Sequence, residues 1–453
     1  MAAYSLIADF SNHESSCKMH ESKTIVKVPF LDEGGTLCYG IGNALLGLHK
    51  KGIYPTEEGI DYLCLAGLVY LADTRISRRR HSQDSWTREI DLTLPVFYPE
   101  KWNNSAALFA RMLDFLTGDR WTISFSKRNI SLAPKRTSKY GAFDVATLYS
   151  GGMDSLIGTI NNLEQGKKIA LVSHAGDPYT RNIQTDLLKQ FKENYSETMP
   201  EYLKLWMAYS KAAIPNGGVE NTTRSRSFLF IAYGIFAVSG MNGVRELQVP
   251  ENGLIALNIP LDGLRVGSHS TRTTHSFYLD LWNQVLSKTD MGISTVNPYW
   301  HRTKGEMAAE CLNQEFLQKI IGDSSSCSSP TKSRWGGAES QHCGYCVPCI
   351  IRRAAINRAF GADNDPTKYF VKDINIMVSN HAKSKGVQLR SFQVAIARLR
   401  KHPEIAKAFV FKTGNLLGSP EYLQKAAEVY RNGLFEVDDF IQTSIQKSAD
   451  MGE

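Results

Sequence analysis

Hydrophobic and polar positions follow one pattern in the first third of the chain. Three stretches alternate apolar and polar side chains, as half-buried strands do: residues 24–31, 88–98 and 121–126. Two others carry apolar residues at helical spacing: residues 60–76 and 105–118. We therefore expect an N-terminal α+β module over residues 1–140. Its polar and basic end, residues 127–140, is the expected linker to the next domain.

The pattern changes at residue 143 to strands that alternate with helices. The expected strands are residues 143–150, 169–174, 202–209, 245–250 and 254–261. The expected helices are residues 151–166, 182–195 and 225–240. Repeated βα units predict a parallel sheet covered on both faces, with binding groups at the carboxyl ends of its strands. We assign residues 141–365 to this α/β domain.

The last part of the chain has a helical pattern. Residues 391–409 and 421–446 place apolar side chains at helical spacing, and no chemically reactive cluster accompanies them. We expect residues 366–453 to form a C-terminal helical extension that serves packing or a partner surface.

Composition limits the class of protein. The 453 residues are 42% hydrophobic and 21% charged, which excludes a disordered or collagen-like chain. No window resembles a membrane span, and the first residues lack the basic and apolar parts of a secretory signal, so we expect a cytoplasmic protein without membrane contact. The net charge of +7 comes partly from Arg78–Arg80. An anionic partner such as nucleic acid could bind these arginines, but such a run is usually a solvated face. Nucleic acid therefore stays an open partner.

The strongest chemical signal is the hexapeptide Ser150-Gly151-Gly152-Met153-Asp154-Ser155, between an expected strand and an expected helix. Two glycines let backbone N–H groups approach an anion, and a helix start adds unpaired N–H groups, which together form a phosphate cradle. Ser150 and Ser155 add hydroxyl donors, while Asp154 can orient the loop or hold Mg²⁺. A capped turn without a ligand is the alternative. Because the hexapeptide lacks GxxxxGK[ST] and GxGxxG, γ-phosphoryl transfer and dinucleotide binding are disfavoured.

Two further groups are candidates for the same site. Ser173 and His174 end the second expected strand, where ribose and adenine would lie, although His174 can equally be a surface histidine. Arg224 and Arg226 open the helix at 225–240 and offer cationic donors to phosphate, or else are solvated arginines at a capped helix start.

Half of the eight cysteines gather in one segment, at Cys327, Cys343, Cys346 and Cys349. Four thiolates are the ligand set of a closed, tetrahedral structural Zn²⁺ site, which would hold the segment together and leave no position for water. A [4Fe–4S] cluster and a redox dithiol are the alternatives.

The glycine loop followed by this cysteine motif resembles the QueC (7-cyano-7-deazaguanine synthase) family of PP-loop ATP pyrophosphatases. His342, Arg352 and Arg353 beside the cysteines fit the resemblance, as does Lys304 within residues 297–308. The loop Ser270-Thr271-Arg272 resembles the family's substrate-side loop, with Thr271 and Arg272 as substrate-binding residues. The resemblance covers residues 143–360; the N-terminal module and the helical extension make the chain more like the QueC-like proteins of bacterial anti-phage systems such as Qat.

This resemblance implies a fold, a reaction and site residues. The fold is a parallel-sheet PP-loop domain of the adenine nucleotide alpha hydrolase type. The reaction adenylates a 7-carboxy-7-deazaguanine-like acid with ATP and Mg²⁺, releases pyrophosphate and transfers the acyl group to an amine. The family's amine is ammonia, which gives amide and nitrile. From the extra half of the chain we instead expect a protein amine, most simply the N-terminus of a partner protein of a defence operon. Expected catalytic residues are Asp154, Arg224, Arg226 and Lys304, and Glu251 and Asn252 are candidates for the base edge or for a simple turn.

Two other functions stay open. PP-loop enzymes also activate tRNA bases, for example for thiolation, which often needs a mobile catalytic cysteine or an iron–sulfur cluster. The four cysteines are instead expected to be committed to one metal. A non-catalytic nucleotide or nucleobase sensor in a defence complex would carry a degraded loop, whereas Ser150 to Ser155 is intact.

Overall fold

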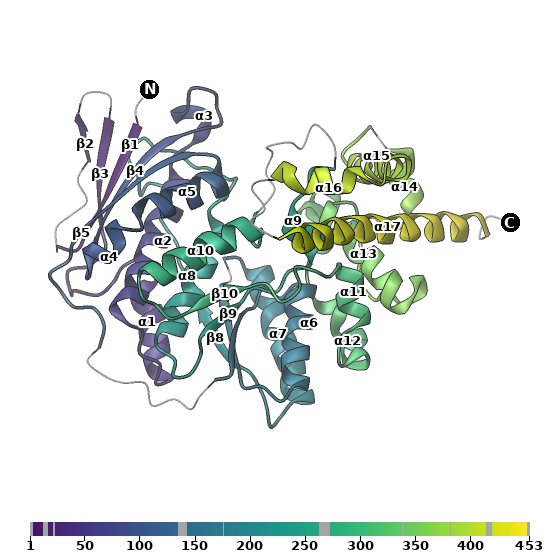
Figure 1. The fold of residues 1–453 in the computed structure, drawn as a ribbon, viewed down its shortest axis with the longest axis horizontal. Coiled ribbons are helices and arrows are strands. Elements are labelled where there is room, and N and C mark those ends of the chain that lie inside the picture. The colour runs from purple at the N-terminus through teal and green to yellow at the C-terminus, as the bar shows by residue number, and fades with distance from the viewer. Residues whose placement is uncertain are drawn as a thin grey trace.

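The described part of the chain forms two five-stranded sheets, followed by a group of C-terminal helices (Figure 1). The computed structural model describes residues 3–11, 17–20, 23–134, 143–174, 176–261, 272–337, 339–380, 382–413 and 419–450. Within those ranges, no helix has both the length and the apolar character needed to cross a membrane.

The first sheet has the strand order β2-β3-β1-β4-β5, and among its described pairs only β2–β3 is antiparallel. The module is therefore of the α/β type, and the expected α+β class is wrong, because helices connect strands that run in parallel. Its strands are β1 (Ala3–Asp9), β2 (Cys17–His20), β3 (Lys23–Pro29), β4 (Glu89–Val96) and β5 (Arg120–Lys127). Its helices are α1 (Ile41–Lys50), α2 (Glu57–Arg75), α3 (Arg78–His81), α4 (Pro99–Asn103) and α5 (Ala106–Thr117). Buried side chains alternate along β3, β4 and β5, which confirms the predicted strands, and α2 and α5 confirm the predicted helices.

Some basic side chains of this module are buried rather than solvated. The guanidinium of Arg128 is buried against the carboxylates of Glu57 and Asp61, at 2.9 and 2.7 Å, so the predicted linker begins inside the core. Residues 135–142 lie outside the described part of the chain. Of the run Arg78–Arg80, expected on a solvated face, Arg78 is buried between Asp73 and Asp119, whereas Arg79 and Arg80 are exposed as expected. Charged side chains can be buried when carboxylates pair with them, and composition does not reveal such pairs.

The second sheet is entirely parallel, with the order β10-β9-β6-β7-β8, as the βα pattern predicts. Its strands are β6 (Val145–Leu148), β7 (Ile169–His174), β8 (Glu201–Leu205), β9 (Glu246–Gln248) and β10 (Ser294–Val296). Helices between and after them are α6 (Met153–Glu164), α7 (Pro178–Asn194), α8 (Arg226–Ser239), α9 (Gly253–Leu257), α10 (Ser276–Lys288), α11 (Lys304–Ala309) and α12 (Gln314–Ile320).

The predicted strand at residues 254–261 is wrong. Residues Gly253–Leu257 form the short helix α9, because the side chain of Asn252 accepts the backbone N–H of Ile255 at 3.1 Å and caps it. A short apolar run fits a buried helix as well as a buried strand, so its pattern did not distinguish the two.

The two sheets share one hydrophobic core. Helix α2 packs on the first sheet with one side and on α8 with the other, and α8 in turn covers β6, β7 and β9. Both helices are apolar nearly all round because each is covered on two sides. The expected sheet with helices on both faces is confirmed, since α6 lies against β6 and β7 as well.

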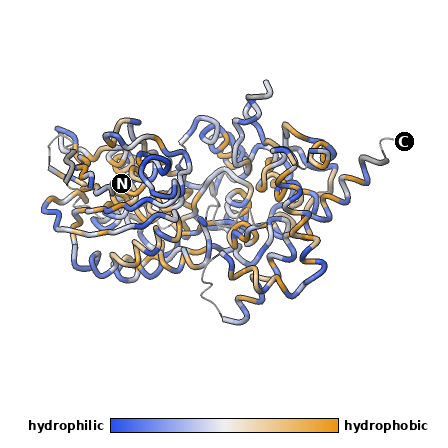
Figure 2. The backbone as a smooth tube through the Cα atoms, turned by 90° about the horizontal axis from the view of Figure 1, so that it is seen from above, coloured by the Kyte–Doolittle hydropathy of each residue, from blue (hydrophilic) through white to orange (hydrophobic). Residues whose placement is uncertain are grey.

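The C-terminal helices form a second hydrophobic core with α9. They are α13 (Val347–Phe360), α14 (Ile374–Ser379), α15 (Val387–Lys401), α16 (Ile405–Val410) and the long α17 (Pro420–Asp450), which confirms the predicted helical pattern. Hydrophobic and hydrophilic residues alternate along the tube that leads to the C-terminus in Figure 2, as in a helix with one buried side.

Candidate functional site

A cavity of about 390 Å³ opens at the carboxyl ends of β6, β7 and β9. Such ends are where open α/β sheets bind their ligands. The predicted residues that line this cavity are Ser150, Ser155, Ser173, His174, Arg226 and Glu251. The structure therefore brings together groups from four segments that lie up to about a hundred residues apart in the sequence.

The glycine loop joins β6 to α6 at one wall of the cavity. Gly151 has a φ of +78°, a conformation that favours glycine, and Gly152 caps α6. The Ser155 hydroxyl donates to the carbonyl of Gly152 at 3.0 Å, and the Ser150 hydroxyl accepts the N–H of Gly152 at 3.1 Å. The first turn of α6 thus follows a short, internally bonded loop, an arrangement suited to an anion.

Asp154 is the centre of a buried polar group beside the loop. Its Oδ1 accepts from the ammonium of Lys304 at 2.7 Å, and its Oδ2 accepts from the side-chain amide and the backbone N–H of Asn252 at 2.8 and 3.2 Å. The three predicted residues thus form one cluster, although 150 positions separate Asp154 from Lys304. Because both carboxylate oxygens are engaged, the geometry favours the orienting role of Asp154.

His174 and Arg226 both line the cavity and both lie against Phe230. The His174 ring lies against Phe230 and Tyr233, with centroids 5.2 and 5.7 Å away, and Arg226 lies over Phe230. Burial, together with the charge of Arg226, lowers the pKa of His174 to about 4. The imidazole is therefore neutral at pH 7, and Arg226 is the cation available to an anionic ligand.

Three predicted residues lie elsewhere. Arg224 donates to the carbonyl of Thr117 at 2.7 Å and covers the Trp86 ring, so it binds the N-terminal module. Arg272 does the same at the carbonyl of Phe115. The Met153 side chain packs in the core beneath the loop and offers only its backbone. Thr271 lies outside the described residues.

Glu251 stands between the cavity and a second, smaller pocket. Thr274, which lines both, donates its hydroxyl to the Glu251 carboxylate. Asn297 accepts the backbone N–H of Glu251 at 3.2 Å and donates to its carbonyl at 2.7 Å. Burial raises the pKa of Glu251 to about 7. This residue is therefore a carboxyl group inside the cavity, and the capped turn that its neighbour Asn252 forms is also present.

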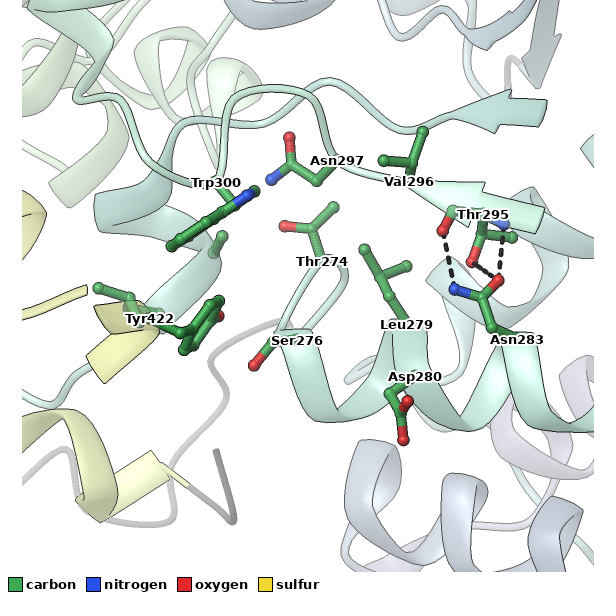
Figure 3. Close-up of a pocket in the computed structure, with 12 residues that line it drawn as sticks. Thr274, Ser276, Leu279, Asp280, Asn283, Thr295, Val296, Asn297, Trp300 and Tyr422 are labelled. Atoms are coloured by element: carbon green, nitrogen blue, oxygen red, sulfur yellow. Dashed lines mark hydrogen bonds between the residues drawn. The ribbon is translucent and has the colours of Figure 1, made fainter. Parts of the chain in front are cut away.

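The second pocket has a volume of about 210 Å³ and is shown in Figure 3. Trp300 and Tyr422 lie at one end, with stacked rings whose centroids are 4.4 Å apart. Asn283 and Thr295 are hydrogen-bonded at the other end, and Thr274 lies between. The lining of this pocket therefore comes from both the C-terminal helix α17, which carries Tyr422, and the segment before Lys304, which carries Trp300.

The four predicted cysteines meet at one point. The Sγ atoms of Cys327, Cys343, Cys346 and Cys349 all lie within 4.8 Å of one another, with separations of 3.9 Å for Cys327–Cys346 and 4.0 Å for Cys343–Cys349. A tetrahedral Zn²⁺ with four Zn–S bonds requires about 3.8 Å between sulfurs. Backbone N–H groups of Cys343 and Cys346 also point at these sulfurs, as expected around thiolates. The donor set therefore fits zinc.

The cysteine segment touches the glycine loop directly. Ser325 donates its N–H to the Gly151 carbonyl at 2.9 Å, and Ser326 lines the cavity. Arg352 is fully buried and donates to the hydroxyls of Ser324 and Ser326, while His342 accepts the N–H of Ser326. Arg353 donates to the Lys372 carbonyl instead. Arg352 and His342 thus support the segment that carries Cys327.

Two residues at the loop were not predicted. Gln184 of α7 is buried and donates to the carbonyls of Tyr149 and Ser150 at 3.3 and 3.2 Å. Tyr202 of β8 donates to Gln184 and to the Ser173 hydroxyl. An amide on an amphipathic helix gives no sequence signal of this role, since most such residues face solvent.

No protein-family model and no curated protein sequence matches the chain.

Proposed function

We propose that this protein activates a carboxylic acid with ATP as an acyl-adenylate and transfers the acyl group to an amine. The observation that carries the proposal is the nucleotide-sized cavity bounded by the glycine loop, with the buried pair Asp154–Lys304 beside it. The resemblance of the two motifs to the QueC family supplies the substrate class, a 7-carboxy-7-deazaguanine-like acid.

In the first step, a carboxylate oxygen of the acid forms a bond to the α-phosphorus of ATP. The bond from that phosphorus to the bridging oxygen breaks, and pyrophosphate leaves with the electron pair. Backbone N–H groups at the start of α6, the ammonium of Lys304 and the guanidinium of Arg226 would stabilise the charge on pyrophosphate. Asp154 holds Lys304 in place for this task.

In the second step, an amine nitrogen forms a bond to the acyl carbon, and the bond to the AMP oxygen breaks. AMP leaves with the electron pair, and the nitrogen loses a proton. Adenylation is useful because AMP is a far better leaving group than oxide, and the remaining task is to hold the two reactants together. The acceptor is ammonia or the N-terminus of a partner protein from a defence operon.

Mg²⁺ and Zn²⁺ have separate expected tasks. Mg²⁺ usually takes most of its oxygens from nucleotide phosphates and water, which fits a loop whose carboxylate, Asp154, is already bonded to Lys304 and Asn252. Zn²⁺ would be held by the four cysteines and would support the segment at Ser325, with no open position for chemistry.

ATP–pyrophosphate exchange tests the proposal. We expect the purified chain to exchange labelled pyrophosphate into ATP only when 7-carboxy-7-deazaguanine is present, and the Asp154→Ala variant to lose exchange. Release of ADP, or an untouched nucleotide with the acid supplied, contradicts the proposal and favours a sensor. Mass spectrometry of small molecules and of the neighbouring gene's protein then identifies the acceptor, and acid-independent activation of tRNA would favour the tRNA-modifying alternative.

A further inference from the structure

The C-terminal helix α17 contacts the segment that carries Lys304 at several points. Its Tyr422 stacks on Trp300, four residues before Lys304 (Figure 3). Its Asn432 donates to the carboxylate of Glu306 at 3.3 Å. The helix also packs on α9, which directly follows Asn252. Both partners of the Asp154 carboxylate therefore lie on segments that α17 supports.

The most direct contact is made by Glu436, which is buried. One carboxylate oxygen accepts from the Thr303 hydroxyl and from the Arg358 guanidinium, the latter at 2.6 Å. The other accepts from the backbone N–H of Gly305 at 3.2 Å. Thr303 and Gly305 are the two neighbours of Lys304, so one side chain from α17 is hydrogen-bonded on both sides of this lysine, to a hydroxyl and to a backbone N–H.

These hydrogen bonds of Glu436 matter because the Lys304 ammonium lies at the end of a flexible side chain, so its position depends on where the backbone of Lys304 is held. Lys304 is the first residue of α11, a helix of only six residues. Its Thr303–Glu306 capping box fixes the entry of the helix, and Glu436 fixes where that helix start lies relative to the glycine loop. A shift of about 1 Å at such a position can cost about a hundredfold in rate.

We propose that Glu436 is a positioning residue through which helix α17 sets the Lys304 ammonium against Asp154. The inference rests on the proposed function, in which Lys304 stabilises the departing pyrophosphate. It gives the helical extension a task at the site, since α17 positions a segment beside the glycine loop. None of the described residues that line the main cavity belongs to α17.

A double-mutant cycle tests this role, with ATP–pyrophosphate exchange as the measurement. We expect Glu436→Gln to lower kcat about tenfold with less than a twofold change in the KM for ATP, because glutamine offers one acceptor oxygen in place of two. In a Lys304→Met chain the same substitution should change the remaining rate less than twofold, since its effect passes through Lys304.

The matched control is Asp438→Asn on the same helix. Asp438 is also a buried carboxylate with an arginine partner, but that partner, Arg400, lies in α15 and not beside Lys304. We expect this variant to lose stability in thermal unfolding without a change in kcat. Equal losses of kcat in Asp438→Asn and Glu436→Gln would mean that α17 only stabilises the fold, which overturns the inference.

Gly305→Ala provides a second variant in case Glu436→Gln does not fold. An added Cβ would lie 2.7 Å from the Glu436 carboxyl and from Cδ of Arg358, so it displaces the Glu436 carboxylate while alanine favours the helix itself. We expect the same fall in kcat. If the loss of kcat in either variant simply adds to the loss in Lys304→Met, the role of Glu436 is overturned while the proposed function stands. If the wild-type chain shows no exchange, the proposed function itself is overturned.

Discussion

Ser325 donates its backbone N–H to the carbonyl oxygen of Gly151 over 2.9 Å. This bond joins the segment that leads into Cys327 to the residue at which the glycine loop turns. The segment of the cysteine cluster therefore supports the glycine loop through a backbone hydrogen bond two residues before Cys327. We expect that removing a ligand of the cluster would change ligand binding at the loop.

The first prediction concerns the metal. We expect one zinc per chain by elemental analysis of protein purified without oxygen, and loss of this zinc in Cys346→Ser. The affinity for ATP, measured by calorimetry, should fall in that variant because the segment at Ser325 loses its support. Cys38→Ser is the control, since Cys38 lies outside the cluster. Brown protein that contains iron would contradict the zinc assignment.

The second prediction separates backbone strain from ligand binding. Gly151 and Gly166 both have positive φ, +78° and +70°, so alanine at either position should cost about 1 kcal/mol of unfolding free energy. Only at Gly151 does an added Cβ meet neighbours, Ile183 and Gln184 at 3.2 Å. We expect Gly151→Ala to weaken ATP binding at least tenfold and Gly166→Ala to leave it unchanged. Equal affinities for ATP in the two variants would mean that the glycine loop does not bind the nucleotide.

The third prediction concerns the buried ion pair. Asp154→Asn leaves the Lys304 ammonium without its carboxylate, which should cost about 3 kcal/mol of stability and most of the exchange activity. Adding Lys304→Met should restore stability but not activity, because it removes the uncompensated charge. Asp186→Asn, which breaks an exposed pair with Lys189, serves as the control in denaturant unfolding. Recovery of activity in the double variant would argue against catalysis at this pair.

The fourth prediction separates two arginines that are two positions apart. Arg226→Met should raise the KM for ATP about tenfold, because Arg226 is a cation of the cavity wall. Arg224→Met should instead lower the free energy of unfolding, since its guanidinium binds Thr117 and Trp86. Enzyme kinetics and denaturant unfolding of both variants decide the assignment, and a reversed pair of results would show that it is wrong.

The fifth prediction follows from the pKa of Glu251, raised by burial to about 7 from 4.5. Between these values the folded state keeps a proton that the unfolded state has lost, so the residue lowers stability increasingly as pH rises. Glu251→Gln should therefore stabilise the chain more at pH 8 than at pH 5, by on the order of 2 kcal/mol. Glu197→Gln, in an exposed loop, is the control. The same difference at both pH values would contradict the raised pKa.

Much of the second sheet could be predicted from the sequence because its signals are local. The strand, the glycine loop and the helix that follows lie within about 25 residues, and each has its own pattern. The four cysteines were equally clear, because spacing alone indicates a common metal. The strand predicted at residues 254–261 failed because capping by Asn252 and cover from α17 decided its conformation.

The long-range contacts of the site could not be predicted in this way. Lys304 was identified only through a resemblance, and nothing in its own surroundings indicates that it pairs with Asp154. Gln184 and Thr274 are polar residue types that usually lie on the surface, yet both are buried. Gln184 contacts the glycine loop, and Thr274 contacts Glu251. Arg224 precedes the helix start and Arg226 is the first residue of α8. The sequence predicts this helix start, but it does not indicate that Arg224 contacts Thr117 while Arg226 lines the cavity.

The shared core of α2 and α8 also decides what can be cut from this protein. A chain that starts at residue 143 would expose the apolar side of α8 to water over its whole length. Surfaces of that kind drive aggregation. The N-terminal third is thus required for a folded α/β domain, and any shortened form must carry a replacement for α2.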